Sequence, residues 1–153
     1  MTDQELQALV ERISLQSFGK PFRHQAVFNS RLRTTGGRYH LRDHHIDINP
    51  RMLTMFGEDT LEGVIKHELV HYHLHMAGQS GQHRTKAFKQ LLKAVGGLRF
   101  APEQPRSAKP VKILIYQCEK CGRIYQRKRR INTQKYVCGV CHGKLIYQKT
   151  MLQ

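Results

Sequence analysis

The sequence has few cysteines, few acidic residues and no long apolar run. No stretch approaches the roughly 18 consecutive apolar residues of a membrane span, so we expect a protein that does not enter the membrane. The first residues, MTDQELQALVER, begin acidic and amphipathic rather than basic and then apolar, which argues against a secretory signal. Because the four cysteines form two close pairs without an export signal, we expect reduced thiols and a cytoplasmic location.

Asp and Glu number 11 against 26 Lys and Arg, which gives a formal net charge of +15. Such an excess predicts a polyanionic partner, most often nucleic acid, and says nothing about the fold. The 153 residues suffice for one domain, or for a compact domain with a small appendage. A hydrophobic content of 39% and a charged content of 24% allow a packed core and exclude wholesale disorder.

The N-terminal part alternates between helical and extended patterns. Thr2 and Glu5 have the spacing of a capping box ahead of apolar residues at helical intervals, which predicts a first helix. Short apolar patches separated by turn residues over 26–49 predict two or three antiparallel strands. Gly36 and Gly37 would supply the positive φ of a hairpin turn between them.

Two further helices follow. The first is expected from about Asp59 to Met76, and its apolar residues recur at i, i+4 and i+8. The second is expected from Arg84 to Val95 and should end at Gly96-Gly97. Residues 101–110 hold three of the five prolines and no large apolar residue, which is the composition of a linker. We therefore expect domains at 1–104 and 111–153, joined by a linker at 105–110.

The strongest motif is His67-Glu68-Leu69-Val70-His71, inside the predicted helix. Residues four apart on a helix lie one above the other, so His67 and His71 can bind one zinc ion. Glu68 would lie beside that ion, where it can take a proton from an activated water. The metzincin continuation His-x-x-Gly-x-x-His is absent, because Leu74 and Ala77 occupy the required positions. Histidines that only hydrogen-bond in the core are the alternative interpretation.

A catalytic zinc needs a third protein ligand and an open position. His83 is the favoured candidate, because the glycine-containing loop at 78–81 lets the chain turn back toward the helix. The rivals are His40, His44 and His45. His73 points away from His71 by the helix period, and His75 lies too far along the axis, so both are expected to be surface histidines.

The C-terminal segment is too short for a self-sufficient core and needs a metal. Its two Cys-x-x-Cys pairs are separated by sixteen residues, the spacing of a structural four-cysteine zinc site, with a hairpin arm between the pairs. The expected ligands are Cys118, Cys121, Cys138 and Cys141. A paired redox site is the alternative, and His142 is expected to be a bystander.

Positive charge is concentrated in the same segment. Residues 111–153 carry a formal +9, or about +7 once four thiolates hold Zn²⁺, against +6 for residues 1–110. The run 127–130 reads Arg-Lys-Arg-Arg, and Tyr125, Tyr136 and Tyr147 lie nearby in the sequence. Cations that hold phosphates and tyrosines that stack on bases predict contact with DNA. The alternative is a solvated arm that only promotes solubility.

The stretch HELVHYHLH, the downstream His83, the earlier NSRLRTTGGRY and the paired cysteines together resemble the SprT-like family over nearly the whole chain. The resemblance implies an α+β fold, with a small zincin-like metallopeptidase domain followed by a zinc ribbon. It implies zinc on His67 and His71, Glu68 as the catalytic acid/base, and His83 as the third ligand. Arg84 follows His83 where many relatives have Gly. Eukaryotic relatives named Spartan cleave proteins crosslinked to DNA.

We therefore expect a zinc-dependent metallopeptidase with one catalytic and one structural zinc, acting on DNA-associated or DNA-crosslinked proteins. The alternative is a non-catalytic nucleic-acid-binding or regulatory protein, whose first zinc would have a fourth protein ligand. Metal-assisted hydrolysis of a bond other than a peptide is a third possibility. The sequence predicts neither the physiological substrate nor the oligomeric state.

Overall fold

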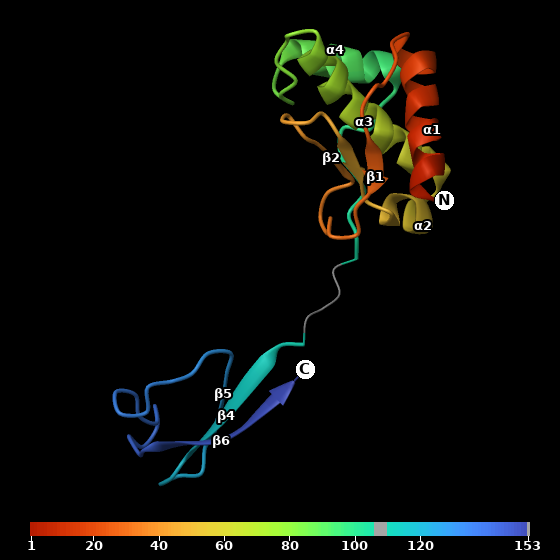
Figure 1. Ribbon diagram of the computed structural model, residues 1–153. Coiled ribbons are helices and arrows are strands. Elements are labelled where there is room, and N and C mark those ends of the chain that lie inside the picture. The colour runs from red at the N-terminus through yellow and green to blue at the C-terminus, as the bar shows by residue number, and fades with distance from the viewer. Residues whose placement is uncertain (106–109, 153) are drawn as a thin grey trace. The chain divides into compact units, whose positions relative to one another are not determined.

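The computed structural model describes residues 1–105 and 110–152 (Figure 1). The chain forms two compact units, Met1–Gln104 and Pro105–Gln153. Most of the linker predicted at 105–110 lies outside the described residues. None of the described helices combines the length and the apolar character that crossing a bilayer requires.

The first helix, α1 (Asp3–Ile13), begins at the predicted capping box. The backbone N–H of Glu5 donates to the Thr2 hydroxyl, and the Glu5 carboxylate accepts from the Thr2 N–H at 2.6 Å. The helix then widens into a π-helical turn, η1 (Ser14–Phe18), which ends at Gly19 with φ 66°. Three fully or largely buried residues of α1 face the core: Leu6, Val10 and Ile13.

A three-stranded sheet follows, made of β1 (Ala26–Phe28), β2 (Gly37–Tyr39) and β3 (Ile46–Ile48), in the order β1-β3-β2. Strands β2 and β3 are antiparallel as predicted, but β1 and β3 are parallel, so the prediction of a wholly antiparallel sheet is wrong. The reason is that β3 lies in the middle of the sheet, between β1 and β2, where it runs antiparallel to β2 and parallel to β1. The hairpin turn is 40–45, not Gly36-Gly37, neither of which has a positive φ.

Three helices complete the first unit. A short helix, α2 (Arg51–Phe56), was not predicted from the sequence. The long helix α3 (Glu58–Met76) packs against α1, α2, β2, β3 and the last helix, α4 (Lys86–Val95), so it forms the centre of the unit (Figure 1). Its predicted apolar stripe is fully buried: Leu61, Ile65 and Leu69. Helix α4 begins at Thr85, whose hydroxyl accepts from the Phe88 N–H, and ends at Gly96 with φ 70°.

The second unit is an antiparallel three-stranded sheet in the order β5-β4-β6, formed by β4 (Lys112–Cys118), β5 (Ile124–Arg127) and β6 (Leu145–Leu152). Its buried cluster is small and consists of Cys118, Cys138 and Leu145. Only the first part of the predicted hairpin arm is a strand, β5, and irregular chain follows it up to Cys138. The described residues as a whole form a mixed α+β structure.

Candidate metal centres

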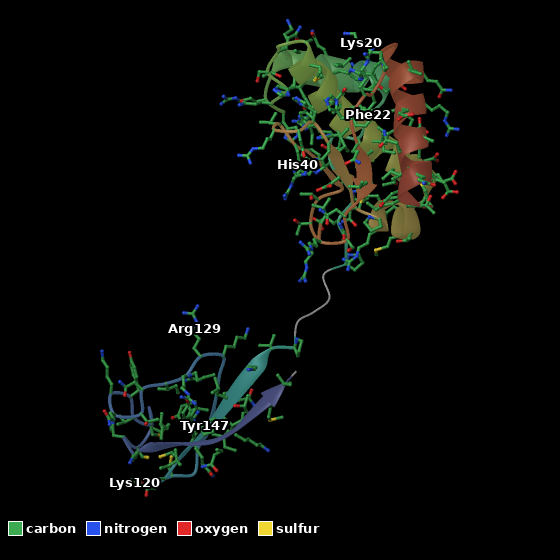
Figure 2. All side chains as sticks on the ribbon, viewed as in Figure 1. Lys20, Phe22, His40, Lys120, Arg129 and Tyr147 are labelled. Carbon is green, nitrogen blue, oxygen red and sulfur yellow. The ribbon has the colours of Figure 1, made fainter. Side chains whose placement is uncertain are left out.

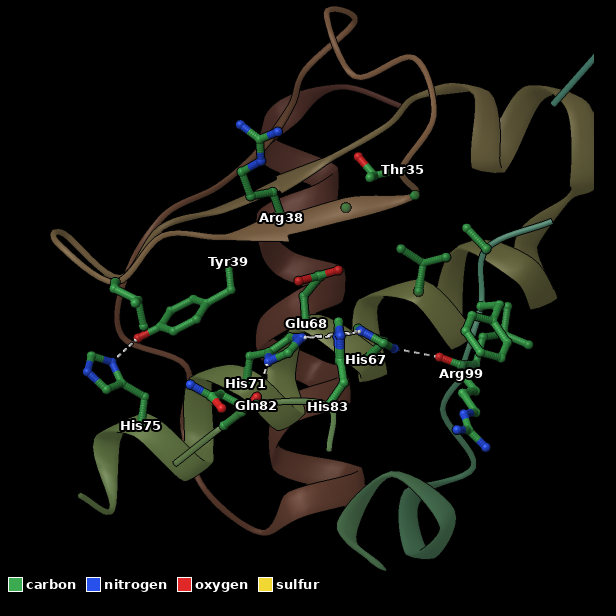
Figure 3. Close-up of a pocket in the computed structure, with 18 of the residues that line it drawn as sticks. Thr35, Arg38, Tyr39, His67, Glu68, His71, His75, Gln82, His83 and Arg99 are labelled. Atoms are coloured by element: carbon green, nitrogen blue, oxygen red, sulfur yellow. Dashed lines mark hydrogen bonds between the residues drawn. The ribbon is translucent and has the colours of Figure 1, made fainter. Parts of the chain in front are cut away.

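Three histidines meet at one face of α3. His67 and His71 lie one helical turn apart, and the chain after α3 turns back so that His83 completes the cluster (Figure 3). The Nε2 atom of His83 lies 2.9 Å from each of the other two Nε2 atoms, which are 3.2 Å apart. Of the four candidates for a third ligand, the structure brings His83 to the pair.

The hydrogen bonds of the two helical histidines fix which nitrogen carries the proton. The Nδ1 atom of His67 is 2.7 Å from the Leu98 carbonyl oxygen, and that of His71 is 2.6 Å from the Gly81 carbonyl oxygen. A carbonyl only accepts, so each Nδ1 donates and a neutral ring presents a lone pair at Nε2. Burial lowers the pKa of His67 and lowers that of His71 to about 4, which keeps both rings neutral.

Convergent lone pairs repel one another and are stabilised by a cation. Three nitrogens bound to one tetrahedral zinc at 2.0–2.1 Å are about 3.3 Å apart, close to the spacing of the three Nε2 atoms. The carbonyls behind His67 and His71 supply the outer hydrogen bonds that orient imidazole ligands. The residues present therefore fit a zinc ion.

Glu68 lies between this cluster and β2, with its carboxylate above the histidines (Figure 3). The side chain is 6% exposed, and its carboxylate accepts a hydrogen bond from the Tyr39 N–H. Burial raises the pKa of Glu68 to about 8, against the smaller opposite effects of that hydrogen bond and of the Arg38 charge. A carboxyl group with a raised pKa beside a candidate metal is suited to exchanging protons at neutral pH.

Gly36, just before β2, and Gly37, the first residue of β2, allow the strand to pass close to α3. A Cβ atom at Gly37 would lie 2.8 Å from Cγ and 2.9 Å from Oε1 of Glu68. A Cβ atom at Gly36 would lie 2.9 Å from Cβ of Ala101 and 3.0 Å from Cγ2 of Val64. The Gly-Gly pair is therefore required by close packing rather than by a turn, which corrects the interpretation of this pair.

These groups line a cavity of about 810 Å³. Residues 34–39, which include β2, form one wall, and residues 98–101 form another. The three histidines and Glu68 lie between these walls (Figure 3). A cavity open to solvent with a cluster of potential metal ligands inside it is a candidate binding site.

Other histidines have roles that the sequence did not reveal. His73, predicted to be a surface residue, is buried, and its Nε2 lies 2.7 Å from the Ser14 hydroxyl because the π-helical turn brings Ser14 against α3. The Tyr39 hydroxyl is 2.6 Å from Nδ1 of His75 and 2.8 Å from Nδ1 of His44. Burial raises the pKa of Tyr39 to about 12, so the phenol stays protonated in the cavity wall.

The second unit brings its four cysteines together. Sγ of Cys118 is 3.4 Å from that of Cys141, Sγ of Cys121 is 3.6 Å from that of Cys138, and all four sulfurs lie within 4.8 Å of one another. Thiolates at 2.3 Å from one tetrahedral zinc are about 3.8 Å apart, so the set fits a structural zinc. His142 is outside the cluster.

Tyr125 supports this cysteine cluster. Its hydroxyl lies 3.1 Å from Sγ of Cys138 and accepts from the Gly139 N–H. Donation from that hydroxyl is the main cause that lowers the pKa of Cys138 to about 5, which favours the thiolate that a metal needs. The sequence analysis expected Tyr125 only near a nucleic-acid surface and missed this contact.

An α+β unit with a three-histidine cluster, followed by a four-cysteine ribbon, defines a class of zinc-binding proteins, and the chain belongs to the SprT-like family. The model of the SprT-like family matches residues 6–109, and that of the SprT-like zinc ribbon domain matches residues 115–149. This family is related to metallopeptidases.

Curated relatives match almost end to end. "Protein SprT-like" from Enterococcus faecalis is 57% identical over 148 residues, covering 97% of this chain and 96% of the relative. The protein of the same name from Bacillus cereus is 54% identical over 149 residues, covering 97% and 98%. That from Lactiplantibacillus plantarum is 57% identical over 146 residues, covering 95% and 98%. No solved structure matches this chain.

Proposed function

We propose that this protein is a zinc-dependent metallopeptidase that acts on DNA-associated or DNA-crosslinked proteins. The observation that supports it best is the meeting of three Nε2 atoms within 3.2 Å of one another, beside the buried Glu68. His67, His71 and His83 would hold the zinc. When bound, zinc supplies a Lewis acid that polarises the scissile carbonyl and acidifies water. Glu68 accepts the proton of the attacking water and passes it to the leaving amine.

The edge of β2 suits an extended peptide. The bonds from Asn49 N–H to the Gly36 carbonyl and from His40 N–H to the His45 carbonyl belong to the pairing of β2 with β3. By the alternation of an antiparallel ladder, the backbone groups of Gly37 and Tyr39 face the other side, toward the cavity. The Tyr39 N–H donates to the Glu68 carboxylate, and the remaining backbone groups of this edge can pair with a substrate strand.

Replacing Gly37 with alanine tests this close packing. The added Cβ would displace the Glu68 side chain, so we expect cleavage to slow by about 10- to 100-fold, as misplacement of a reacting group by 1 Å can do. The zinc content should not change, because no ligand is touched. The matched control is Gly139→Ala, where the nearest atom would be 3.9 Å away. Unchanged cleavage by Gly37→Ala would contradict the role of the β2–Glu68 contact.

The DNA part of the proposal rests on the surface of the second unit. Residues 127–130 are all exposed cations, while Tyr136 and Tyr147 are 55% and 47% exposed. Cations bind phosphates without regard to sequence, and exposed aromatic rings stack on unpaired bases. Arg31, Arg33 and Arg38 of the first unit are the next candidates for DNA contact.

Replacing Arg127, Lys128, Arg129 and Arg130 with serine should weaken DNA binding. Each lost phosphate contact removes about 0.9 from the slope of log affinity against log salt concentration on duplex DNA. Titrations at several salt concentrations measure both effects. The control replaces four exposed cations of the first unit, Arg12, Arg23, Arg42 and Lys86, and so changes the net charge equally. Equal loss in both variants would mean that net charge, not this run, attracts DNA.

The decisive test of function is cleavage of a DNA-bound protein by the zinc-loaded chain, with and without DNA. We expect chelator-sensitive cleavage that DNA stimulates by bringing enzyme and substrate together. A chain that binds DNA but cleaves neither this substrate nor an unfolded protein would instead be the non-catalytic DNA-binding protein.

A further inference from the structure

The turn between β2 and β3, together with β3, gathers a third set of candidate metal-binding groups. His40 and His45 stand at the two ends of this turn, joined by the bond from the His40 N–H to the His45 carbonyl at 3.0 Å. His44 has φ 63°, a left-handed conformation that residues other than glycine seldom adopt, and it closes the turn. The rings of His40 and His45 stack, with their centroids 3.8 Å apart and their planes 11° apart. Figure 2 labels His40 at this end of the sheet.

Both rings direct a nitrogen toward one carboxylate. Nε2 of His40 is 3.0 Å from Oδ2 of Asp47, and Nε2 of His45 is 3.4 Å from Oδ1 of the same residue. Asp47 lies in the middle of β3 and is 6% exposed, and its Oδ2 also accepts from the Asn29 side-chain amide at 2.9 Å. The Asn29 amide therefore holds the carboxylate in place.

A further carboxylate fixes the proton on His45. Nδ1 of His45 lies 2.6 Å from Oδ1 of Asp43, so Nδ1 donates to that oxygen. A neutral His45 ring then has a lone pair at Nε2, which faces an Asp47 oxygen that is also an acceptor. This contact between two acceptors needs either a second proton on His45 or a cation between them.

We propose that His40, His45 and Asp47 bind a divalent transition-metal ion of the zinc type. Two imidazoles and one carboxylate form a common ligand set for such ions. The ligand atoms of the three residues lie within 4.8 Å of one another, and one imidazole has to turn out of the stack for both Nε2 lone pairs to meet at one ion. Asp43 behind His45 forms the carboxylate–histidine arrangement that orients metal-binding imidazoles, and Asn29 does the same for Asp47.

The ion would join the turn after β2 to the centre of β3. Strand β2 carries Gly37 and Tyr39, which contact Glu68, so a bound ion would stiffen the wall of the cavity without contributing to the chemistry. The site shares no residue with the His67 cluster or with the cysteine cluster. It therefore does not depend on the proposed peptidase activity.

The test uses the full chain, with zinc already bound at its cysteine and His67 clusters. This protein is titrated with Zn²⁺, followed by calorimetry, and with Co²⁺, followed by absorption spectroscopy. We expect one additional ion per chain, whose cobalt spectrum lacks the thiolate charge-transfer bands of the cysteine site. His45→Ala should abolish this binding. Asp43→Asn should weaken it about 10-fold, because a neutral amide oxygen is a weaker acceptor for the His45 Nδ1–H than a carboxylate is. His24→Gln, outside all three clusters, is the control and should bind as the wild type does.

The Asp43→Asn variant keeps the test valid if His45→Ala folds poorly, because the Asp43 side chain is 63% exposed and its replacement keeps its size. No additional ion in the wild type would overturn the proposal and leave the cluster as a doubly protonated His45 between two carboxylates. An additional ion bound equally well by wild type, His45→Ala and Asp43→Asn would place that ion elsewhere and overturn it too.

Discussion

Replacing Glu68 with glutamine is expected to reduce peptide cleavage by at least about 100-fold and to leave the zinc content of the protein unchanged. An amide keeps the shape of the side chain but cannot take up the proton, and general acid–base catalysis contributes roughly 10²–10⁴-fold. The amide oxygen can still accept the Tyr39 N–H, so the contact with β2 survives. Because the amide matches the buried carboxyl group in size and carries no charge that burial penalises, the replacement should not lower the melting temperature.

The matched control is Glu62→Gln on the same helix. Glu62 pairs with Lys66 at 2.8 Å on the outer face and lies outside the cavity lining. Its replacement should cost at most a few tenths of a kcal/mol and leave cleavage intact. The test measures the cleavage rate, the zinc content and the melting temperature of both variants. Chelator-sensitive cleavage that persists in Glu68→Gln would show that another group is the base.

Replacing Cys138 with serine is expected to unfold the ribbon while the first unit stays folded. The described residues of the ribbon bury few hydrophobic side chains, namely Ile115, Tyr116, Cys118, Cys138 and Leu145, so the metal must supply most of its stability. Structural zinc contributes about 10–16 kcal/mol in small zinc-finger peptides, a contribution that a missing thiolate removes in large part. Hydrogen exchange followed by mass spectrometry should show lost protection in 111–152 and retained protection in 1–104.

The control for this experiment is His142→Ala. This residue adjoins Cys141 but lies outside the cysteine cluster, so the variant should keep its zinc and its protected amides. Cys138→Ser should hold one zinc fewer per chain than His142→Ala. Full protection of β4 and β6 in Cys138→Ser would mean that the ribbon folds without its metal.

Local patterns predicted the three longer helices, α1, α3 and α4, but not α2, and they predicted the sheet only in part. The capping box at Thr2 and the apolar stripe of α3 depend on residues within a few positions of one another, and both are present in the structure. The parallel pairing of β1 with β3 depends on which strand takes the sheet edge, and that is decided by packing against α3. The role of Gly36 and Gly37 was likewise not predictable from local patterns, because the residues they pack against, Ala101 and Glu68, are distant in sequence.

The candidate ligands came from short-range spacing, but the groups that orient them did not. The carbonyls of Leu98 and Gly81 hold His67 and His71, and the Tyr39 N–H holds Glu68. Any residue has such backbone groups, so no residue type marks them in the sequence. The buried position of His73 likewise depends on the π-helical turn that follows α1.

The three histidines of the first unit are held unequally. Carbonyl oxygens anchor the rings of His67 and His71 before any ion arrives, whereas the exposed His83 has no hydrogen-bond partner for its Nδ1 among the described residues. The rings of His67 and His71 are thus fixed by hydrogen bonds, whereas His83 lies in the loop between α3 and α4. In the proposed zinc site, the ion is therefore expected to enter and leave through movement of His83, and the rate of metal exchange should depend on residues 77–85.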